Sequence, residues 1–445
     1  MSSKIDFSDI KDFSDAYNSD PASLVMTNVL ARNKSDTFGI VPQSGREQHF
    51  QFSCEIPTMK SVDQKHSGRC WLYAATNILR ERVARELDLE FFELSQVYLA
   101  FWDKFERCNY FLNNILATAD RPVGDETVRW LLKNVYGGDG GQWDMFVNLI
   151  EKYGICPKDA MPETEQTQNT GAVNGHVTAF MRVTAHRLRE LVAAGASAEE
   201  IDAARRDALR QVYDCLCRFY TEPPRSFDFE YTDRSGKYHV EPDMTPRAFS
   251  EKYIGNFLDR FVSVINAPTA DKPFGRLYTV KLLGNVAGGR PVRYYNVPMD
   301  EFRELVRRQL SDGELVWFGS DSAKFRDRAR SLWDDKSFND PMFTGLGISY
   351  DKTVGLDYGI SFMIHAMALT GYNEDPRTGE INRWKIENSY GPDGANGGYY
   401  FCSGTWFDRF VYQAVIDKKY LDIPADAEEK LIELEPWDPM GTLAD

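Results

Sequence analysis

The stretch after Gly68-Arg69 carries a strong helical pattern of hydrophobic positions. From Cys70 to about Leu87 there is no glycine or proline, and apolar side chains recur every three or four residues along one face. Those side chains are Leu72, Ala75, Leu79 and Val83. The spacing predicts a core helix with Cys70 at its N-terminus.

Further helices are predicted on both sides of this one. Asp20-Pro21 is a cap residue followed by a proline at the first helical position, which is typical of a helix start. Ser95-Gln96 opens a second, aromatic-rich helix. From about 172 to 220 the chain is charged and keeps apolar residues at helical spacing, so this segment is also predicted to be helical.

Strand patterns dominate the later part of the chain. Residues 227–231 alternate between apolar and acidic side chains, and the turn signal at 233–236 predicts a hairpin. After a helix that Asp300 caps, strands are predicted at 315–318, 362–369, 383–387 and 399–402, because these apolar segments are separated by Gly, Asn, Asp and Pro. The chain therefore runs from a helical half to a strand-rich half.

Three separated segments carry the residue types of thiol catalysis. Cys70 follows Ser-Gly-Arg, and His365 lies in the apolar run Met-Ile-His-Ala-Met. Asn388 directly follows the predicted strand 383–387. A nucleophilic thiol needs an imidazole to take its proton and a side-chain amide to orient that imidazole. Gln64, six residues before Cys70, adds a donor for the oxyanion of the reaction.

The assignment depends on the combination of these residues. Alone, His365 would be read as a buried core histidine and Asn388 as a turn residue. A helix N-terminus and a neighbouring imidazolium both lower the pKa of a thiol. We therefore expect Cys70 to be a thiolate paired with His365.

These segments resemble the papain superfamily of cysteine peptidases, whose nucleophile lies in a Cys-Gly-Ser/Ala-Cys-Trp/Tyr run. Gly68, Cys70 and Trp71 match that run. Ser67 replaces its first cysteine, which removes a disulfide partner, and Arg69 replaces the small residue before the nucleophile. The Ser-Gly-Arg-Cys-Trp version resembles the bleomycin hydrolase and bacterial aminopeptidase C branch, which is intracellular.

The resemblance implies an α+β, papain-like, two-lobed fold with a large helical insertion. His365 lies about 295 residues after Cys70, whereas papain-like chains place the base roughly 130–150 residues downstream. The expected parts are an N-terminal arm packed on the core (1–60), a helical lobe with the nucleophile (61–165), an insertion of helices and a hairpin (166–290), a β-rich lobe with the histidine and asparagine (291–425) and a C-terminal tail that enters the active-site cleft (426–445).

The resemblance also implies substrate-binding residues. Gly140 and Gly141 match the paired glycines along which the family lays the substrate backbone, although glycines this dense also form plain turns. The end of the chain is similar to the family's tail, so that Ala444 and Asp445 are expected to meet the free α-ammonium of the substrate. Tyr390 stands where relatives usually carry a tryptophan that covers the bond between Asn388 and His365.

Composition fits a globular enzyme with reduced thiols. Hydrophobic residues make up 42% of the chain, with 28 Phe, 22 Tyr and 9 Trp, which excludes a disordered chain. The seven cysteines are scattered and match neither a Cys-x-x-Cys pair nor a zinc site. The chain starts without an apolar signal segment and has no run long enough to span a bilayer. We therefore expect a cytoplasmic protein without a metal, a cofactor or a membrane attachment.

Charge narrows the set of partners. The 52 basic and 67 acidic side chains give a net charge of −15, which repels phosphate backbones. The favoured function is a thiol aminopeptidase that removes N-terminal residues from peptides through an acyl-enzyme on Cys70, in a homo-oligomer that the resemblance makes a hexamer. Two alternatives stay open: an endopeptidase with an open cleft, and a non-catalytic or nucleic-acid-binding barrel.

Overall fold

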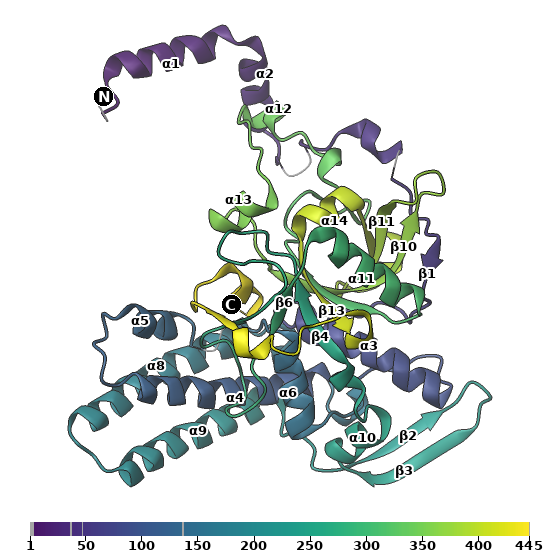
Figure 1. The fold of residues 1–445 in the computed structure, drawn as a ribbon. Helices are drawn as coiled ribbons and strands as arrows, with labels where there is room; N and C mark the ends of the chain where they lie inside the picture. Colours follow the sequence, from purple (N-terminus) through teal and green to yellow (C-terminus); the bar gives the residue numbers. More distant parts are fainter. Residues whose placement is uncertain (1–3, 36–37, 47, 136–137, 445) are drawn as a thin grey trace.

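The structure is a computed structural model and describes residues 4–35, 38–46, 48–135 and 138–444. Its elements form a helical lobe and a sheet lobe, and the N-terminal helices project away from both (Figure 1). The α+β class and the two-lobed, papain-like organisation expected from the sequence are confirmed.

The helical lobe is built around the helix that Cys70 opens. This helix, α3, spans Cys70–Leu87, the bounds that the hydrophobic pattern predicts, and its apolar face is buried. Ser95 caps the next helix, since its hydroxyl accepts a hydrogen bond from the Tyr98 N–H at 3.1 Å. The remaining helices of the lobe are α4 (Gln96–Ala117), α5 (Glu126–Lys133), α6 (Trp143–Tyr153) and the short α7 (Glu165–Gln168).

The insertion lies beside this lobe as a helix pair and a hairpin. Helices α8 (Gly171–Ala193) and α9 (Ala198–Tyr220) pack on each other and on α4 (Figure 1). A capping box between Ser197 and Glu200 fixes the start of α9. The hairpin of β2 (Phe227–Thr232) and β3 (Tyr238–Met244) is followed by α10 (Pro246–Tyr253).

The second lobe is a mixed sheet. Its strand order is β14-β5-β6-β4-β13-β7-β10-β11-β12-β9-β8, and β1 pairs with β10 outside this path. The strands are β1 (Cys54–Glu55), β4 (Phe261–Ile265), β5 (Arg276–Val280), β6 (Tyr294–Asn296), β7 (Val316–Ser320), β8 (Arg326–Asp327), β9 (Leu332–Trp333), β10 (His365–Glu374), β11 (Ile381–Glu387), β12 (Tyr399–Ser403), β13 (Val411–Asp417) and β14 (Ile432–Leu434). The helices of this lobe are α11 (Met299–Ser311), α12 (Pro341–Thr344), α13 (Lys352–Asp357) and α14 (Gly404–Phe410).

The sheet begins earlier in the chain than the sequence pattern suggests. Strands β4 and β5 fall inside the range 166–290 that was expected to be insertion, yet β4 pairs with β13 and β5 pairs with β6 in the main sheet. Strand β4 is an almost continuous buried apolar run, and such a run lacks the alternation that identifies a strand in sequence. The boundary between insertion and sheet lobe therefore lies near 261 and not at 291.

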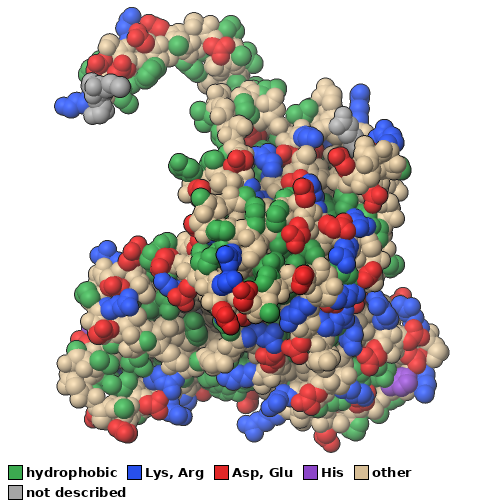
Figure 2. All heavy atoms as spheres, in the orientation of Figure 1, with side chains coloured by type: hydrophobic (Ala, Val, Ile, Leu, Met, Phe, Trp, Pro, Cys, Tyr) green, Lys and Arg blue, Asp and Glu red, His purple; other side chains and the backbone are tan. Residues whose placement is uncertain are grey.

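The N-terminal arm also differs from its expected position on the core. Neither α1 (Phe7–Ser19) nor α2 (Pro21–Leu30) has a buried residue, and Figure 2 shows hydrophobic side chains along this projecting arm. On α1 the apolar side chains share one face, with Phe7 93% and Phe13 63% exposed. Contacts with the later part of the chain are made from Phe38 onward, where the Phe38 ring lies 6.5 Å from that of Phe343 and Ile40 bridges to Phe338. Among the described residues, α1 packs on α2, which leaves most of its apolar face exposed.

The two lobes meet along α3, which packs on β7 and β10. The indole N–H of Trp317 on β7 donates to the carbonyl of Trp71 on α3 at 3.1 Å, and both tryptophans are buried. This contact fixes the start of α3 against the middle of the sheet. Among the described residues, no helix has the length and apolarity needed to cross a membrane.

Candidate active site

The start of α3 places the Cys70 thiol against the start of β10. Arg69, the residue before the helix, makes no side-chain cap, and the backbone N–H groups of Cys70 and Trp71 at the start of α3 interact with the thiol. The N–H of Ala366 donates to Cys70 Sγ at 3.5 Å. Because Ala366 follows His365 directly, the nucleophile and the base expected from the sequence lie at one site.

Strand pairing brings Asn388 to the same place. Strands β10 and β11 are antiparallel, with Ala368 opposite Glu387, so the end of β11 lies beside the start of β10. His365 Nε2 and Asn388 Oδ1 are 2.9 Å apart. The same Oδ1 accepts the N–H of Ser389 at 2.8 Å, which holds the amide toward the imidazole. The other ring nitrogen of His365 is left to exchange a proton with the thiol.

Gln64 links the nucleophile loop to the end of β11. Its Nε2 donates to the Ser67 carbonyl at 2.5 Å, and the Ser389 hydroxyl donates to its Oε1 at 2.5 Å. The Gln64 N–H also donates to the Ser389 carbonyl at 2.9 Å. The side chain is buried, and one N–H of its amide has no partner among these bonds. The four residues expected to form the catalytic set therefore lie together.

Burial opposes the thiolate and imidazolium expected from the sequence. Burial raises the pKa of the Cys70 thiol to about 11, and the N–H groups of Ala366 and Trp71 only partly oppose that rise. Burial also lowers the pKa of His365 to about 4, although its hydrogen bond with Asn388 works in the other direction. At neutral pH the two groups together hold one proton, and the structure favours its position on sulfur.

Tyr390 covers the imidazole. The rings of His365 and Tyr390 are stacked, with centroids 5.3 Å apart and an interplanar angle of 16°. The guanidinium carbon of Arg326 lies 4.8 Å from the centroid of the same tyrosine ring. Tyr390 therefore provides the aromatic wall that the resemblance assigns to a tryptophan.

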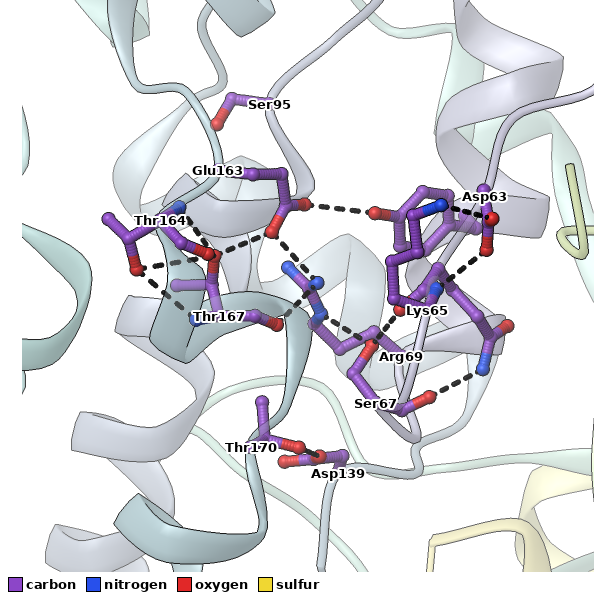
Figure 3. A network of polar contacts seen from close by, with 12 residues as sticks. Asp63, Lys65, Ser67, Arg69, Ser95, Asp139, Glu163, Thr164, Thr167 and Thr170 are labelled. Atoms are coloured by element: carbon purple, nitrogen blue, oxygen red, sulfur yellow. Dashed lines mark hydrogen bonds and ion pairs between the residues drawn. The ribbon is translucent and has the colours of Figure 1, made fainter.

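A buried arginine braces the loop before the nucleophile (Figure 3). Arg69 Nη2 donates to Glu163 Oε2 at 3.0 Å and to the Thr167 carbonyl at 2.8 Å. Its Nε donates to the Ser67 hydroxyl at 2.9 Å, and that hydroxyl donates to the Gln64 carbonyl at 2.7 Å. We call Ser67, Arg69, Glu163 and Thr167 the arginine clamp. The clamp ties the nucleophile loop to the segment that leads into the insertion.

Asp139 braces the loop from its other side. Its carboxylate accepts the Gly68 N–H at 3.2 Å and is also bound by Lys104 and Thr170. Burial raises the pKa of this carboxyl, but the Lys104 ammonium and these hydrogen bonds together hold the pKa well below its ordinary value. Asp139 is therefore charged at neutral pH. Neither it nor Glu163 could be identified from sequence, since no local motif marks either one.

The two glycines have different surroundings. A Cβ built on Gly141 would lie 2.6 Å from the Trp71 ring, so the indole beside the nucleophile requires glycine here. The Gly140 carbonyl accepts a hydrogen bond from Arg107. Substrate binding along these glycines stays a prediction, and Gly141 has a packing role in addition.

The C-terminal tail is tied to the body before it reaches the site. Lys272 Nζ and the Asp438 carboxylate are 2.8 Å apart. The Tyr294 hydroxyl donates to the Met440 carbonyl at 3.0 Å, and the Met440 side chain is buried. These contacts direct the last residues toward the start of β10.

The last described turn of the tail lies beside the catalytic histidine. The Thr442 hydroxyl donates to the carbonyl of Met363, two residues before His365, at 2.8 Å. Leu443 is buried, and the turn ends at Ala444. Asp445, the second expected tail contact, lies outside the described residues.

Comparison with known proteins agrees with this geometry. The family model described as "Peptidase C1-like family" matches residues 4–441. The chain belongs to this family. It is 43% identical over 451 residues to aminopeptidase C of Lactobacillus delbrueckii subsp. lactis, a match that covers 100% of this chain and 99% of the relative. It is 38% identical over 405 residues to bleomycin hydrolase of Gallus gallus, covering 89% of each.

A solved structure shows the same fold. The crystal structure of PepW from Lactobacillus rhamnosis HN001 is 42% identical and superposes with a TM-score of 0.94 over 99% of both chains. The cysteine peptidase class and the bleomycin hydrolase and aminopeptidase C branch expected from the sequence are therefore confirmed. Among the described residues, no group of three or more His, Cys, Asp or Glu side chains is arranged to hold a metal ion.

Proposed function

We propose that this peptidase removes single residues from peptide N-termini through an acyl-enzyme on Cys70. His365 accepts the thiol proton as sulfur attacks the scissile carbonyl carbon and the C–S bond forms. The imidazolium then gives that proton to the leaving amine as the C–N bond breaks. A water molecule, deprotonated by His365, hydrolyses the thioester and restores the thiol. Asn388 orients the imidazole throughout.

In this proposal, Gln64 and the Cys70 N–H stabilise the oxyanion of both steps. The support is the position of the Gln64 amide, which Ser67 and Ser389 hold from two sides. A donor fixed before the reaction needs no reorganisation as charge develops on the carbonyl oxygen.

The single observation that carries the exopeptidase assignment is the route of the tail. Thr442 binds the Met363 carbonyl beside the catalytic histidine. We propose that the end of the tail, Ala444 and Asp445, contacts the free α-ammonium of the substrate, which pairs with the α-carboxylate and the side-chain carboxylate of Asp445. The tail is proposed to fill the subsites on the N-terminal side of the scissile bond. Gly140 and Gly141 are proposed to contact the residue that is removed.

The test compares aminoacyl 4-methylcoumarin amides with their N-acetylated equivalents. The wild type should hydrolyse the free-amine substrates and leave the acetylated ones. A variant without residues 442–445 should lose rate on the first set and gain rate on acetylated peptides. Removing one partner of a desolvated charge pair costs about 2–5 kcal/mol, so the free-amine preference should fall by at least about 30-fold.

The alternatives correspond to distinct results. Cleavage of acetylated peptides by the wild type would favour the endopeptidase with an open cleft. Absence of hydrolysis, together with submicromolar affinity for DNA at physiological salt, would favour the non-catalytic barrel. The net charge of −15 argues against that barrel.

We further propose a homohexamer, as implied by the branch to which the chain belongs. The exposed apolar face of α1, with Phe7, Ile10 and Phe13, supports burial of the arm against another copy. A cytoplasmic location is proposed because all seven cysteines are free. Multi-angle light scattering of the full chain, compared with a chain that lacks residues 1–38, tests the role of the arm.

A further inference from the structure

A large groove opens on one side of the catalytic histidine. It encloses about 1150 Å³ and includes Ile364, the residue before His365, and Tyr390, which stacks on the imidazole. No described residue of the tail lines it. The tail instead reaches the site at Met363. The tail and the groove are therefore separate approaches to the same catalytic centre.

Arg326 lines this groove and has no carboxylate partner among the described residues. Its guanidinium lies 4.8 Å from the Tyr390 ring, 5.6 Å from the Tyr400 ring and 5.7 Å from the Trp333 ring, measured from its carbon to each centroid. Its Nε is buried without a hydrogen-bond partner, and its Nη2 donates to the Tyr400 hydroxyl at 3.4 Å. Aromatic rings fix the cation in place without neutralising its charge.

The other charges of the groove leave it basic near Arg326. Asp327 and Asp335 each form an ion pair with another arginine, at 2.6 and 2.8 Å. The third acid, Asp340, lies against Gly39 where the arm joins the body. Lys324 and Arg328 flank Arg326 on the same loop. A positive groove on a protein with a net charge of −15 indicates a site for an anionic ligand.

The backbone beside Arg326 is strained. Phe325 has φ of +52°, a left-handed conformation that is rare for a bulky residue. Its ring packs on Phe338 and Phe410, with centroids 5.7 and 5.6 Å away. Packing of this kind maintains a strained conformation, and such strain is concentrated at functional sites. The conformation presents Arg326 between the aromatic rings.

The distance to the reaction suggests the length of the ligand. The separations of 5.3 Å between the His365 and Tyr390 rings and 4.8 Å from Tyr390 to Arg326 place the guanidinium within about 10 Å of the imidazole. Two or three extended residues at roughly 3.3–3.6 Å each cover that distance. A peptide whose first residue is held on the tail side must leave through the opposite side.

We propose that Arg326 binds the terminal carboxylate of the leaving peptide, so that tripeptides and tetrapeptides with a free C-terminus are preferred substrates. This proposal rests on the exopeptidase function proposed above. The aromatic rings hold the guanidinium fork toward the groove, where a carboxylate can accept two hydrogen bonds. The cation then selects both the length of the peptide and its free carboxyl end.

The experiment uses peptides of two to six residues with one constant N-terminal residue, each as the free acid and as the C-terminal amide. For the wild type, the ratio of kcat/KM for acid over amide should peak at three or four residues, at about 10- to 100-fold, as expected for a hydrogen bond to a charged group. In Arg326→Gln the ratio should fall to near one. Arg326→Lys, which keeps the charge without the fork, should give an intermediate ratio.

Arg328→Gln is the matched control, since it removes one positive charge from the same loop, and its ratio should stay near that of the wild type. A ratio between two substrates of one enzyme does not depend on how much of a variant is folded. A wild-type ratio near one at every length, or an equal loss in Arg328→Gln, would overturn the proposal. An N-acetylated copy of the series separates failure of the exopeptidase function from failure of the Arg326 proposal. Cleavage of the acetylated peptides by the wild type would contradict the exopeptidase function, whereas the ratio of acid over amide would still report on Arg326.

Discussion

The Tyr390 ring lies almost parallel to the His365 imidazole, 16° from coplanar and 5.3 Å away between centroids. Its position shields the hydrogen bond between His365 and Asn388 from water on that side. The resemblance to papain-like enzymes implies a larger indole here, and the phenol ring still provides a stacked face.

We predict that Tyr390→Ala lowers kcat about 3- to 10-fold, because exposure to water weakens an intramolecular hydrogen bond worth about 0.5–1.5 kcal/mol. Tyr390→Trp should retain the wild-type kcat. Steady-state kinetics on an aminoacyl 4-methylcoumarin amide provides the measurement. An alanine variant with unchanged kcat would show that the ring does not protect the histidine.

Gln64→Ala should reduce the acylation rate by about 10²–10³-fold, as expected for the loss of one oxyanion donor. The variant should also lose about 1–3 kcal/mol of stability, because the Ser67 carbonyl and the Ser389 hydroxyl lose a buried partner. Single-turnover kinetics and urea unfolding measure the two effects. A stability loss without a rate loss would limit Gln64 to a structural role.

Cys70 and His365 by themselves should allow activity over a wide pH range. Below about pH 4 the imidazole binds a second proton and cannot accept that of the thiol, since burial lowers the pKa of His365 to about 4. Above about pH 11 the pair loses its last proton, since burial raises the pKa of Cys70 to about 11. Activity therefore falls as the pH drops through about 4 and as it rises through about 11.

For free-amine substrates, kcat/KM should already fall as the pH rises through about 8, where the α-ammonium loses its proton. The variant without residues 442–445 should lose this early fall, because it no longer binds the ammonium. Profiles of kcat/KM from about pH 3 to 12 for both proteins make the comparison and also cover both limits of the catalytic pair. Identical alkaline limbs in the two would contradict recognition by the tail.

Removing one partner of the arginine clamp should lower the stability of the protein. Glu163→Gln removes one partner of a buried ion pair with the almost fully buried Arg69 and should lower the free energy of unfolding by about 3–5 kcal/mol. Arg377→Gln, which removes an 85% exposed arginine from its pair with Asp375, is the control and should leave that free energy almost unchanged. Equal effects of the two substitutions in urea unfolding would contradict the clamp.

The sequence predicted those parts of the fold that a capping residue or a hydrophobic period identifies locally. The start of α3 at Cys70 and the cap of α2 by Asp20 follow from sequence, since each depends on neighbouring residues. Strand β4 was missed because a fully buried strand has no alternation. The position of the arm was missed because the apolar face of α1 could pack on the same chain or on another.

For the active site, the sequence predicted only the catalytic residues and their order along the chain. Cys70, His365 and Asn388 come together because the pairing of β10 with β11 places two predicted strand ends side by side. Burial favours the neutral forms of Cys70 and His365 over the expected charged forms, and burial depends on the whole fold. The partner of Arg69 is 94 residues away in sequence, and no local pattern encodes that distance.

The serine at position 67 has a consequence for how the enzyme responds to reductants. A peptidase with a cystine in this loop can lose the loop's shape under the same thiol reagents that regenerate an oxidised nucleophile. Here Ser67 supports the loop through hydrogen bonds and no cystine is present among the described residues, so a reducing agent that regenerates Cys70 leaves these bonds intact. Reactivation after mild oxidation of Cys70 should therefore require only its reduction, without refolding of the loop.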